Sequence, residues 1–343
     1  MSNVILTICD SNRMYCERLQ EYLRNHLKLT FDIHAFTDVG RFLDFSGEKE
    51  ISLLIISESA LRLIMREETN VNVKNVIILD EETREWSGSE KDLFPMATVR
   101  HISKYVPAGQ IAGGVLELCT DKAECFGGLC GNGRANESKV IGLFTPISRS
   151  GQTPLTVKMG ESLSRTHKSI MLSFESFSAL PSMFEAEAEE DITDLLYYAE
   201  CERDKFCIYL EKIKKHKNGL DYISPARTAM QVKEISFEKV KELIRLLTEE
   251  AGYEYILLDL KEYPDGFFDI LGMCDVIYTI TRNNSADHYR MGKYNRVLGD
   301  NGYEDVIART IKCMMPDVRE GISYNRYIEA LLAEGREVLS LGA

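Results

Sequence analysis

Residues Pro146–Thr153, with the sequence P-I-S-R-S-G-Q-T, come nearest in type and spacing to a known chemistry. They follow an apolar run and precede a helical pattern, so we expect a strand, a tight turn and a helix. At such a junction, backbone N–H groups and the positive end of the helix dipole face an anion. The motif G-x-x-x-x-G-K-[ST] adds a lysine for phosphates and a hydroxyl for Mg²⁺. Gly151 and Thr153 keep the last glycine and the hydroxyl, whereas Gln152 replaces the lysine.

The loop departs from the phosphate-binding pattern at several further positions. Pro146 stands in place of the first glycine. Gln152 can donate a hydrogen bond to a phosphate but supplies no charge. Arg149 supplies a charge, but away from the lysine position. Two interpretations stay open: a retained nucleotide pocket, or a plain strand–turn–helix joint. The candidate nucleotide-binding residues are Ser150, Gly151, Gln152, Thr153, Pro154 and Asp259.

Asp259 lies near the end of the apolar run Tyr255–Leu260. An acid near the end of such a run is typical of a central parallel strand. The alternative is an aspartate that caps the following turn. Glu175 holds a similar position after the run Lys168–Phe174.

The elements that must position these residues alternate between short apolar runs and helical patterns. In the first part of the chain we expect strands at 4–10, 31–36, 52–57, 75–80 and 99–105, with a closing helix near 111–118. In the second part we expect strands at 139–144, 168–174, 255–260 and 275–281. Ser236 and Gly252 bound an amphipathic helix. The pattern predicts an α/β protein with two doubly wound parallel sheets.

The expected domains are residues 1–118 and 139–343, joined by a linker at 119–138. The linker prediction rests on glycine, asparagine and serine, and on the missing apolar stripe. Its cysteines, Cys119, Cys125 and Cys130, lack the C-x2-C pairs and the nearby histidine of a metal site. The basic run Glu211–Lys217 we interpret as a solvated helix face.

The chain has 343 residues and a formal net charge of -13. Such a charge disfavours non-specific binding to nucleic acid. No run approaches the ~20 apolar residues that span a bilayer, and the acidic C-terminal helical pattern lacks a lysine-rich face, so we expect no direct membrane insertion. The nine scattered cysteines and the absence of an export signal predict reduced thiols and a cytoplasmic location.

Around Gly151, Thr153 and Asp259 the chain resembles the MinD/ParA family of P-loop NTPases. The resemblance makes Asp259 the Walker B acid, and so the candidate catalytic residue, and it makes Thr153 and Asp259 the candidate Mg²⁺ ligands. It places Ile147 where the family has a second, signature lysine. The segment after Asp259, L-K-E-Y-P-D-G, lacks the P-A-G pattern of the family's switch region. The implied cofactor is ATP with Mg²⁺, and the alternative is that no nucleotide binds.

The order of the segments along nearly the whole chain resembles the TadZ/CpaE-type proteins of Flp (Tad) pilus loci. These are atypical MinD-like ATPases preceded by a receiver-like domain. The segments that carry the resemblance are DLLYYAE, LDYISPART, YEYILLDL and CDVIYTITRNNSADHYRMGKY.

The receiver-like part departs from a working receiver at the acceptor position. The first expected strand ends in Cys9-Asp10, one acid where receivers carry a pair. The third ends at Ser57, which cannot form an acyl phosphate, with Glu58 beside it. Asp80 ends the fourth strand, and Lys104 matches the receiver lysine. We expect a pseudo-receiver that binds a protein partner or a second copy.

Two functions remain open. The first is a non-catalytic scaffold or localisation factor for a Flp (Tad) pilus or a similar membrane-associated assembly, recruited to the membrane or cell pole through partners. The second is a regulatory ATPase in which nucleotide controls dimerisation and hydrolysis is at most weak. The loss of the signature lysine at Ile147 predicts that any homodimer does not enclose ATP between its two copies.

Overall fold

The computed structural model describes residues 4–27, 29–66, 71–81, 93–126, 129, 138–184, 189–316 and 323–341. They divide into two compact units. The first comprises Met1–Gly131 with Asp204–Lys212, and the second comprises Asn132–Arg203 with Ile213–Ala343.

The sheet of the first unit consists of β1 (Val4–Cys9), β2 (Phe31–Phe36), β3 (Leu53–Ser57), β4 (Asn75–Asp80) and β5 (Thr98–Ser103). Their order is β2-β1-β3-β4-β5, and every pair is parallel. This is the flavodoxin-like order of a doubly wound sheet, which changes direction between β1 and β3. Side chains of that change of direction therefore share one crevice at the carboxyl edge.

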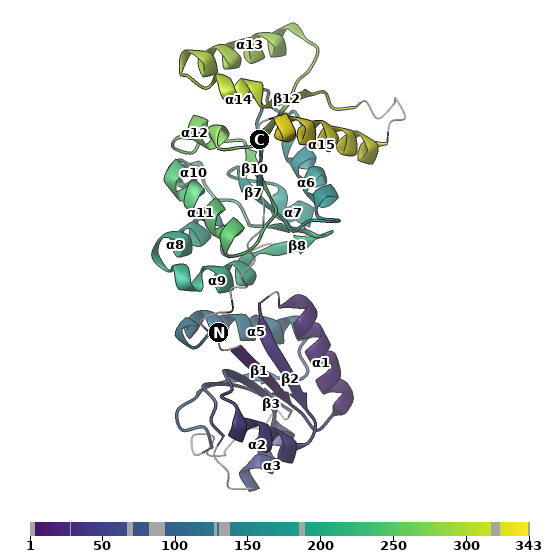
Figure 1. Ribbon diagram of the computed structural model, residues 1–343, viewed down its shortest axis with the longest axis vertical. Coiled ribbons are helices and arrows are strands. Elements are labelled where there is room, and N and C mark those ends of the chain that lie inside the picture. Colours follow the sequence, from purple (N-terminus) through teal and green to yellow (C-terminus); the bar gives the residue numbers. More distant parts are fainter. Residues whose placement is uncertain are drawn as a thin grey trace. The chain divides into compact units, whose positions relative to one another are not determined.

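Helices cover both faces of this sheet, as Figure 1 shows. The helices are α1 (Arg13–His26), α2 (Val39–Glu48), α3 (Glu58–Arg66) and α5 (Ala108–Asp121), with a short 3-10 turn η1 (Ala123–Cys125). Alternate residues of β3 divide between two cores: Leu53 and Ile55 pack with α1 and α5, and Leu54 and Ile56 with α2 and α3. Two buried faces explain why these strands are continuous apolar runs.

The prediction of a linker at 119–138 is wrong for the first residues of that range. Helix α5 continues to Asp121, Cys119 is fully buried, and Phe126 and Leu129 are 1% exposed in the core beside α1 and α5. Burial of these apolar groups outweighs the loop-forming composition of the segment. Cys130 and residues 131–137 lie outside the described residues.

The second sheet has the order β12-β11-β6-β10-β7-β9-β8. Its strands are β6 (Lys139–Leu143), β7 (Ser169–Phe174), β8 (Lys215–Lys217), β9 (Leu220–Tyr222), β10 (Tyr255–Leu260), β11 (Val276–Ile280) and β12 (Thr310–Cys313). All pairs are parallel except β8 with β9. With the first sheet, this confirms the predicted fold class of two doubly wound parallel α/β sheets.

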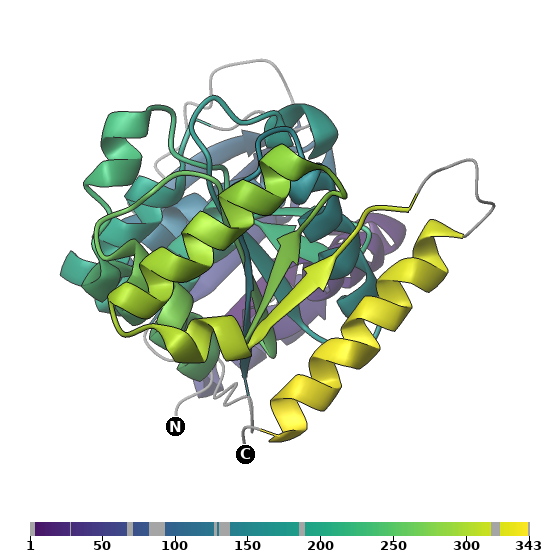
Figure 2. The ribbon, with the colours of Figure 1, turned by 90° about the horizontal axis from the view of Figure 1, so that it is seen from above.

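Helices again lie on both sides of the second sheet, and Figure 1 shows α6 and α15 on one side and α11 and α12 on the other. In Figure 2, α15 runs along the edge strand β12. The helices of this unit are α6 (Gln152–Leu163), α7 (Leu180–Phe184), α8 (Ile192–Cys201), α10 (Ala229–Lys233), α11 (Phe237–Glu249), α12 (Phe267–Gly272), α13 (Ser285–Asp300), α14 (Glu304–Ala308) and α15 (Tyr324–Leu341). The turn η2 (Arg203–Lys205) and helix α9 (Phe206–Ile213), which follow α8, belong almost entirely to the first unit. As the sequence predicts, Ser236 caps α11 by accepting the Lys239 N–H.

The basic run Glu211–Lys217 is not a solvated helix face. Its last three residues form β8, which pairs antiparallel with β9 through a two-residue turn, Asn218-Gly219. Both turn residues have positive φ, 52° and 89°. Asn-Gly is the preferred pair for such a turn because both residues tolerate this conformation.

Candidate functional site

The second unit brings three segments together at the carboxyl edge of its sheet. The register pairs Asp259 of β10 with Leu143 of β6 on one side and with Ser173 of β7 on the other. After β6 the chain makes the tight turn, and α6 begins at Gln152. The structure thus places Asp259 directly beside the first turn of α6, where the sequence predicts it.

The side chains of Gln152, Thr153 and Asp259 form one hydrogen-bonded network. Gln152 Nε2 donates to Asp259 Oδ1 at 2.8 Å and to the Leu143 carbonyl at 3.0 Å. Thr153 Oγ1 donates to Asp259 Oδ2 at 2.7 Å, and Ser173 Oγ donates to the same oxygen at 3.3 Å. The groups expected to face phosphate and Mg²⁺ therefore bind one another.

Asp259 is a fully buried carboxyl group. Burial raises its pKa above the ordinary value, and the hydrogen bonds from Thr153 and Gln152 lower the pKa by less. The three donors in contact with this carboxylate are neutral, so none offsets the desolvation of the ionised form with a charge. Asp259 can therefore keep a proton to a higher pH than an exposed aspartate.

The loop before α6 is bent by two left-handed residues. Gly151 precedes the helix with φ 87°, and Arg149 adopts φ 53°, which few residues other than glycine accept. The Arg282 guanidinium donates a hydrogen bond to the Arg149 carbonyl. Ile147, at the signature-lysine position, is only 2% exposed. Its side chain is packed inside the unit.

Glu175 and Lys261 flank the network on its solvent side. Lys261 Nζ lies 2.6 Å from Glu175 Oε1. Glu175 Oε2 accepts hydrogen bonds from Ser178 Oγ at 3.1 Å and Thr153 Oγ1 at 3.4 Å. The nearby lysine is thus already paired with a carboxylate.

The residues present do not fit a tightly held nucleoside triphosphate. Arg149 is the only cationic side chain of Pro146–Thr153, and it is exposed. Ser150 is half-buried, and the exposed Pro154 in the first turn of α6 has no N–H to offer an anion. Thr153 and Asp259 have the right oxygens for Mg²⁺, and the Thr153 hydroxyl keeps its lone pairs for a cation while it donates to Asp259.

The first unit has a charged cluster at the corresponding edge of its own sheet. Lys104 Nζ lies 2.7 Å from Asp10 Oδ2 and 2.7 Å from Glu81 Oε1. Burial lowers the pKa of the Lys104 ammonium, but its hydrogen bonds to Asp10 and Glu81 outweigh burial and raise the pKa overall. Glu81 is a partner that the sequence reasoning missed, although it directly follows β4.

The other receiver-like positions are also engaged within the first unit. Ser57, fully buried, lies with its Oγ 3.1 Å from Ser59 Oγ. Glu58 Oε2 accepts the Glu81 N–H at 3.1 Å. Asp80 Oδ1 lies 2.9 Å from His101 Nδ1. The residue that ends β3 is a serine with a hydroxyl group and no carboxylate.

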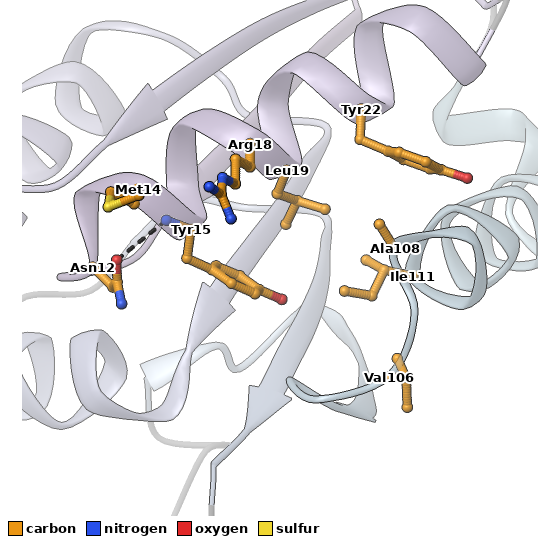
Figure 3. A pocket seen from close by; sticks show the side chains of 9 residues that line it. All are labelled: Asn12, Met14, Tyr15, Arg18, Leu19, Tyr22, Val106, Ala108 and Ile111. Atoms are coloured by element: carbon orange, nitrogen blue, oxygen red, sulfur yellow. Dashed lines mark hydrogen bonds between the residues drawn. The ribbon is translucent and has the colours of Figure 1, made fainter.

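A groove of about 480 Å³ lies between α1 and the start of α5. In Figure 3, Tyr15 and Tyr22 extend from α1 towards Ala108 and Ile111 of α5. Sequence reasoning missed this groove. The aromatic residues of α1 signalled an apolar face, but the sequence does not tell how much of that face α5 covers.

The described part of the chain has neither a candidate metal-binding cluster nor a candidate membrane-spanning helix. No group of three or more histidine, cysteine, aspartate or glutamate side chains there could hold a metal ion. Within the same residues, no helix is both long enough and apolar enough to cross a membrane.

The second unit's fold and site together define an α/β module with a phosphate-loop-like turn. No protein-family model matches the chain, and no curated protein matches it. Among solved structures, a ParA family ATPase from Chlorobium tepidum TLS is 18% identical over 60% of this chain and 92% of its own, with a TM-score of 0.43.

Two other solved structures are similar at the same level. The MinC:MinD cell division protein complex of Aquifex aeolicus is 17% identical over 53% of this chain and 71% of that one, with a TM-score of 0.40. A putative plasmid partition protein from Borrelia burgdorferi B31, bound to AMPPNP, is 13% identical over 61% and 100%, with a TM-score of 0.39. At such identities and scores, these similarities support no statement about the ligands or partners of this chain.

Proposed function

We propose that the chain is a two-domain scaffold or localisation factor that binds protein partners and does not depend on ATP hydrolysis. One observation carries the proposal: Gln152, at the lysine position of the loop, uses its amide on Asp259 and the Leu143 carbonyl. The loop thus offers no charge at the point where phosphate binding requires one. The resemblance to TadZ/CpaE-type proteins implies a Flp (Tad) pilus or a similar membrane-associated assembly as the setting.

Lys104 of the first unit supports the same function. It is shared between Asp10 and Glu81, and the neighbouring Ser57 cannot be phosphorylated to an acyl phosphate. Neither unit presents a complete set of groups for phosphate chemistry, and each keeps a surface on which a partner can dock. The packed Ile147 also argues against a dimer that encloses ATP.

A second candidate is a regulatory ATPase, favoured by the 2.7 Å contact between Thr153 Oγ1 and Asp259 Oδ2. The hydroxyl oxygen keeps its lone pairs while it donates to the carboxylate, so these two oxygens would be available to Mg²⁺ when nucleotide binds. Under this alternative, ATP binding controls dimerisation and partner binding.

Thermal unfolding with ATP, ADP and Mg²⁺ distinguishes the two candidates. A ligand at about 100 times its Kd stabilises a protein by about 2.7 kcal/mol, or roughly 5–10 °C for a domain of this size. We expect no such shift for the natural chain at millimolar ATP. Gln152→Lys returns a cation to the loop and should give a Mg²⁺-dependent shift, whereas the uncharged control Gln152→Met should not.

The scaffold proposal fails if the natural chain itself shows a Mg²⁺-dependent shift that Thr153→Ala or Asp259→Ala abolishes. Calorimetry is the appropriate measurement, because the only tryptophan, Trp86, belongs to the first part of the sequence.

A further inference from the structure

A pocket of about 250 Å³ opens where the phosphate-loop-like turn begins, and its walls are aromatic. Phe144, the residue after β6, is the centre of the aromatic group. Its ring centroid lies 4.8 Å from that of Phe267 and 5.2 Å from that of Tyr294. Tyr263 packs on Phe267 at 4.9 Å and is still 60% exposed. Buried rings thus form the base of the pocket, and an exposed ring stands at its mouth.

Two cations from α13, Arg290 and Lys293, line the same pocket. Arg290 Nη1 lies 2.7 Å from Asp287 Oδ1, with more than half of its side chain exposed. Lys293 is exposed. These two cations form a positive edge on a chain whose net charge is -13, so the local charge is opposite in sign to the net charge of the chain. Rings beside cations are the composition of interface residues that contribute most to binding.

The size and charge of the pocket select one kind of occupant. Small-molecule sites usually enclose about 300–1,000 Å³, and this pocket is smaller, close to the volume of one large side chain. A symmetric pair of copies meeting here would bring Arg290 and Lys293 of each copy towards those of the other, and like charges oppose such a contact.

We propose that this pocket binds a segment of a partner protein in which an aromatic side chain is flanked by acidic residues. The aromatic side chain enters between Phe144, Tyr263 and Phe267, and the acidic residues face Lys293 and Arg290. The inference rests on the proposed function, because it assigns the scaffold a site for its partner.

The position of the pocket links the partner to the candidate nucleotide site. Pro146, the first residue of the loop, lines the pocket together with Tyr263, which follows Asp259 by four residues. An occupant therefore touches both segments whose side chains form the Gln152–Asp259 network. The docked segment restrains the loop and the strand end without contacting the network itself.

Selection from a phage-displayed library of random heptapeptides on the full chain tests the proposal. We expect the selected peptides to combine Phe or Trp with Asp or Glu. Fluorescein-labelled copies should lose affinity by about tenfold or more with Tyr263→Ala or Lys293→Glu, as measured by anisotropy. Both replaced side chains are exposed, so folding should be retained, and circular dichroism checks this.

Matched controls come from the same helix. Tyr289→Ala and Arg296→Glu change an exposed tyrosine and an exposed arginine of α13 outside the pocket, and each should alter affinity by less than about twofold. The proposal is overturned if selection shows no aromatic and acidic preference, or if the controls weaken binding as much as the pocket variants. Light scattering that shows a dimer dissociated by Tyr263→Ala would assign the pocket to a second copy instead. The peptide-binding assay contains no nucleotide. A negative result there would overturn the pocket proposal alone, and thermal unfolding with ATP would still test the proposed function.

Discussion

At the scale of single residues, Asp259 is a buried carboxyl group whose hydrogen-bond donors are all neutral. A fully buried carboxylate normally has a cation or a metal as partner. This one has the neutral donors of Gln152, Thr153 and Ser173. Its ionised form is therefore costly in the folded state, and the cost depends on pH.

Asp259→Asn should remove this pH-dependent cost. Because the folded pKa of Asp259 is raised, the folded state holds its proton to a higher pH than the unfolded state. The natural chain therefore loses free energy of unfolding as the pH rises above the unfolded pKa of about 4. Urea unfolding at pH 5, 6, 7 and 8 should show the free energy of unfolding of the variant rising relative to that of the natural chain until the folded pKa of Asp259 is passed, with a constant difference above it.

Ser173→Ala is the control, because it removes one neutral donor and keeps the carboxylate. Its difference from the natural chain should vary less with pH than that of Asp259→Asn. Parallel curves for the natural chain and Asp259→Asn would mean that Asp259 does not titrate differently on folding.

Lys104 of the first unit is one partner of a buried ion pair. It contacts Asp10, whose side chain is 1% exposed, while its own side chain is 10% exposed. Removing one partner of a buried pair typically costs about 3–5 kcal/mol, because the other charge stays buried. Lys104→Met keeps the apolar stem and should lower the free energy of unfolding in urea by a value in that range.

The exposed pair Lys158–Glu161 provides the comparison. Lys158→Met should cost about 0–1 kcal/mol, as surface ion pairs do. Equal losses for the two variants would show that water, rather than Lys104, compensates Asp10.

At the scale of elements, the sequence predicts most strands because both of their faces are buried. The run 255–260 coincides with β10, and 75–80 with β4; all but one residue of each strand is buried. The sequence pattern gave a wrong prediction at the start of the expected linker, where a single buried residue decides the structure. Phe126 anchors the supposed linker in the first core, and no composition rule weighs a single aromatic ring against several glycines.

The β8–β9 hairpin was missed for a different reason. Asn218-Gly219 was a usable turn signal, but the lysines around it suggested a solvated helix. The site was predicted to the level of which residues meet, since Gln152, Thr153 and Asp259 do lie together. Their mutual hydrogen bonds could not be predicted from the sequence. The side-chain rotamer of Gln152, rather than the order of the strands, decides whether its amide points towards Asp259.

Gly142 in β6 tests how closely the elements below the site are packed. A Cβ there would lie 2.8 Å from Cys274 Sγ and 3.3 Å from Cys274 Cβ. Gly142→Ala should therefore destabilise the chain by about 1–3 kcal/mol, the usual cost of overpacking a core. Gly272→Ala, in the last turn of α12 with open space around its Cβ position, should be neutral or mildly stabilising. A loss of the same size at both positions in urea unfolding would contradict this packing argument.

At the scale of the whole molecule, both sheets present the same situation at their carboxyl edges. In one, Lys104 satisfies Asp10 and Glu81; in the other, Gln152 and Thr153 satisfy Asp259. In both units, these side chains are engaged in hydrogen bonds or ion pairs within the chain.

The net charge makes a prediction about nucleic acid. With -13 distributed over the chain, we expect no binding to a labelled 30-base-pair duplex at about 50 mM salt, where electrostatic binding is strong. Anisotropy measures this directly. Binding that weakens with salt and disappears in Lys293→Glu with Arg296→Glu would show that α13 overrides the mean field.

The short β8–β9 hairpin at the edge of the second sheet affects how readily copies of the protein aggregate at high concentration. An open sheet edge is a template on which another chain can add a strand, and such additions grow into aggregates. Here the last strand, β8, is three residues long and reads Lys-His-Lys. An incoming strand would find few backbone groups to pair with and two ammonium groups to desolvate. The β8–β9 hairpin, which the sequence analysis did not predict, thus disfavours edge-to-edge association between copies of the protein.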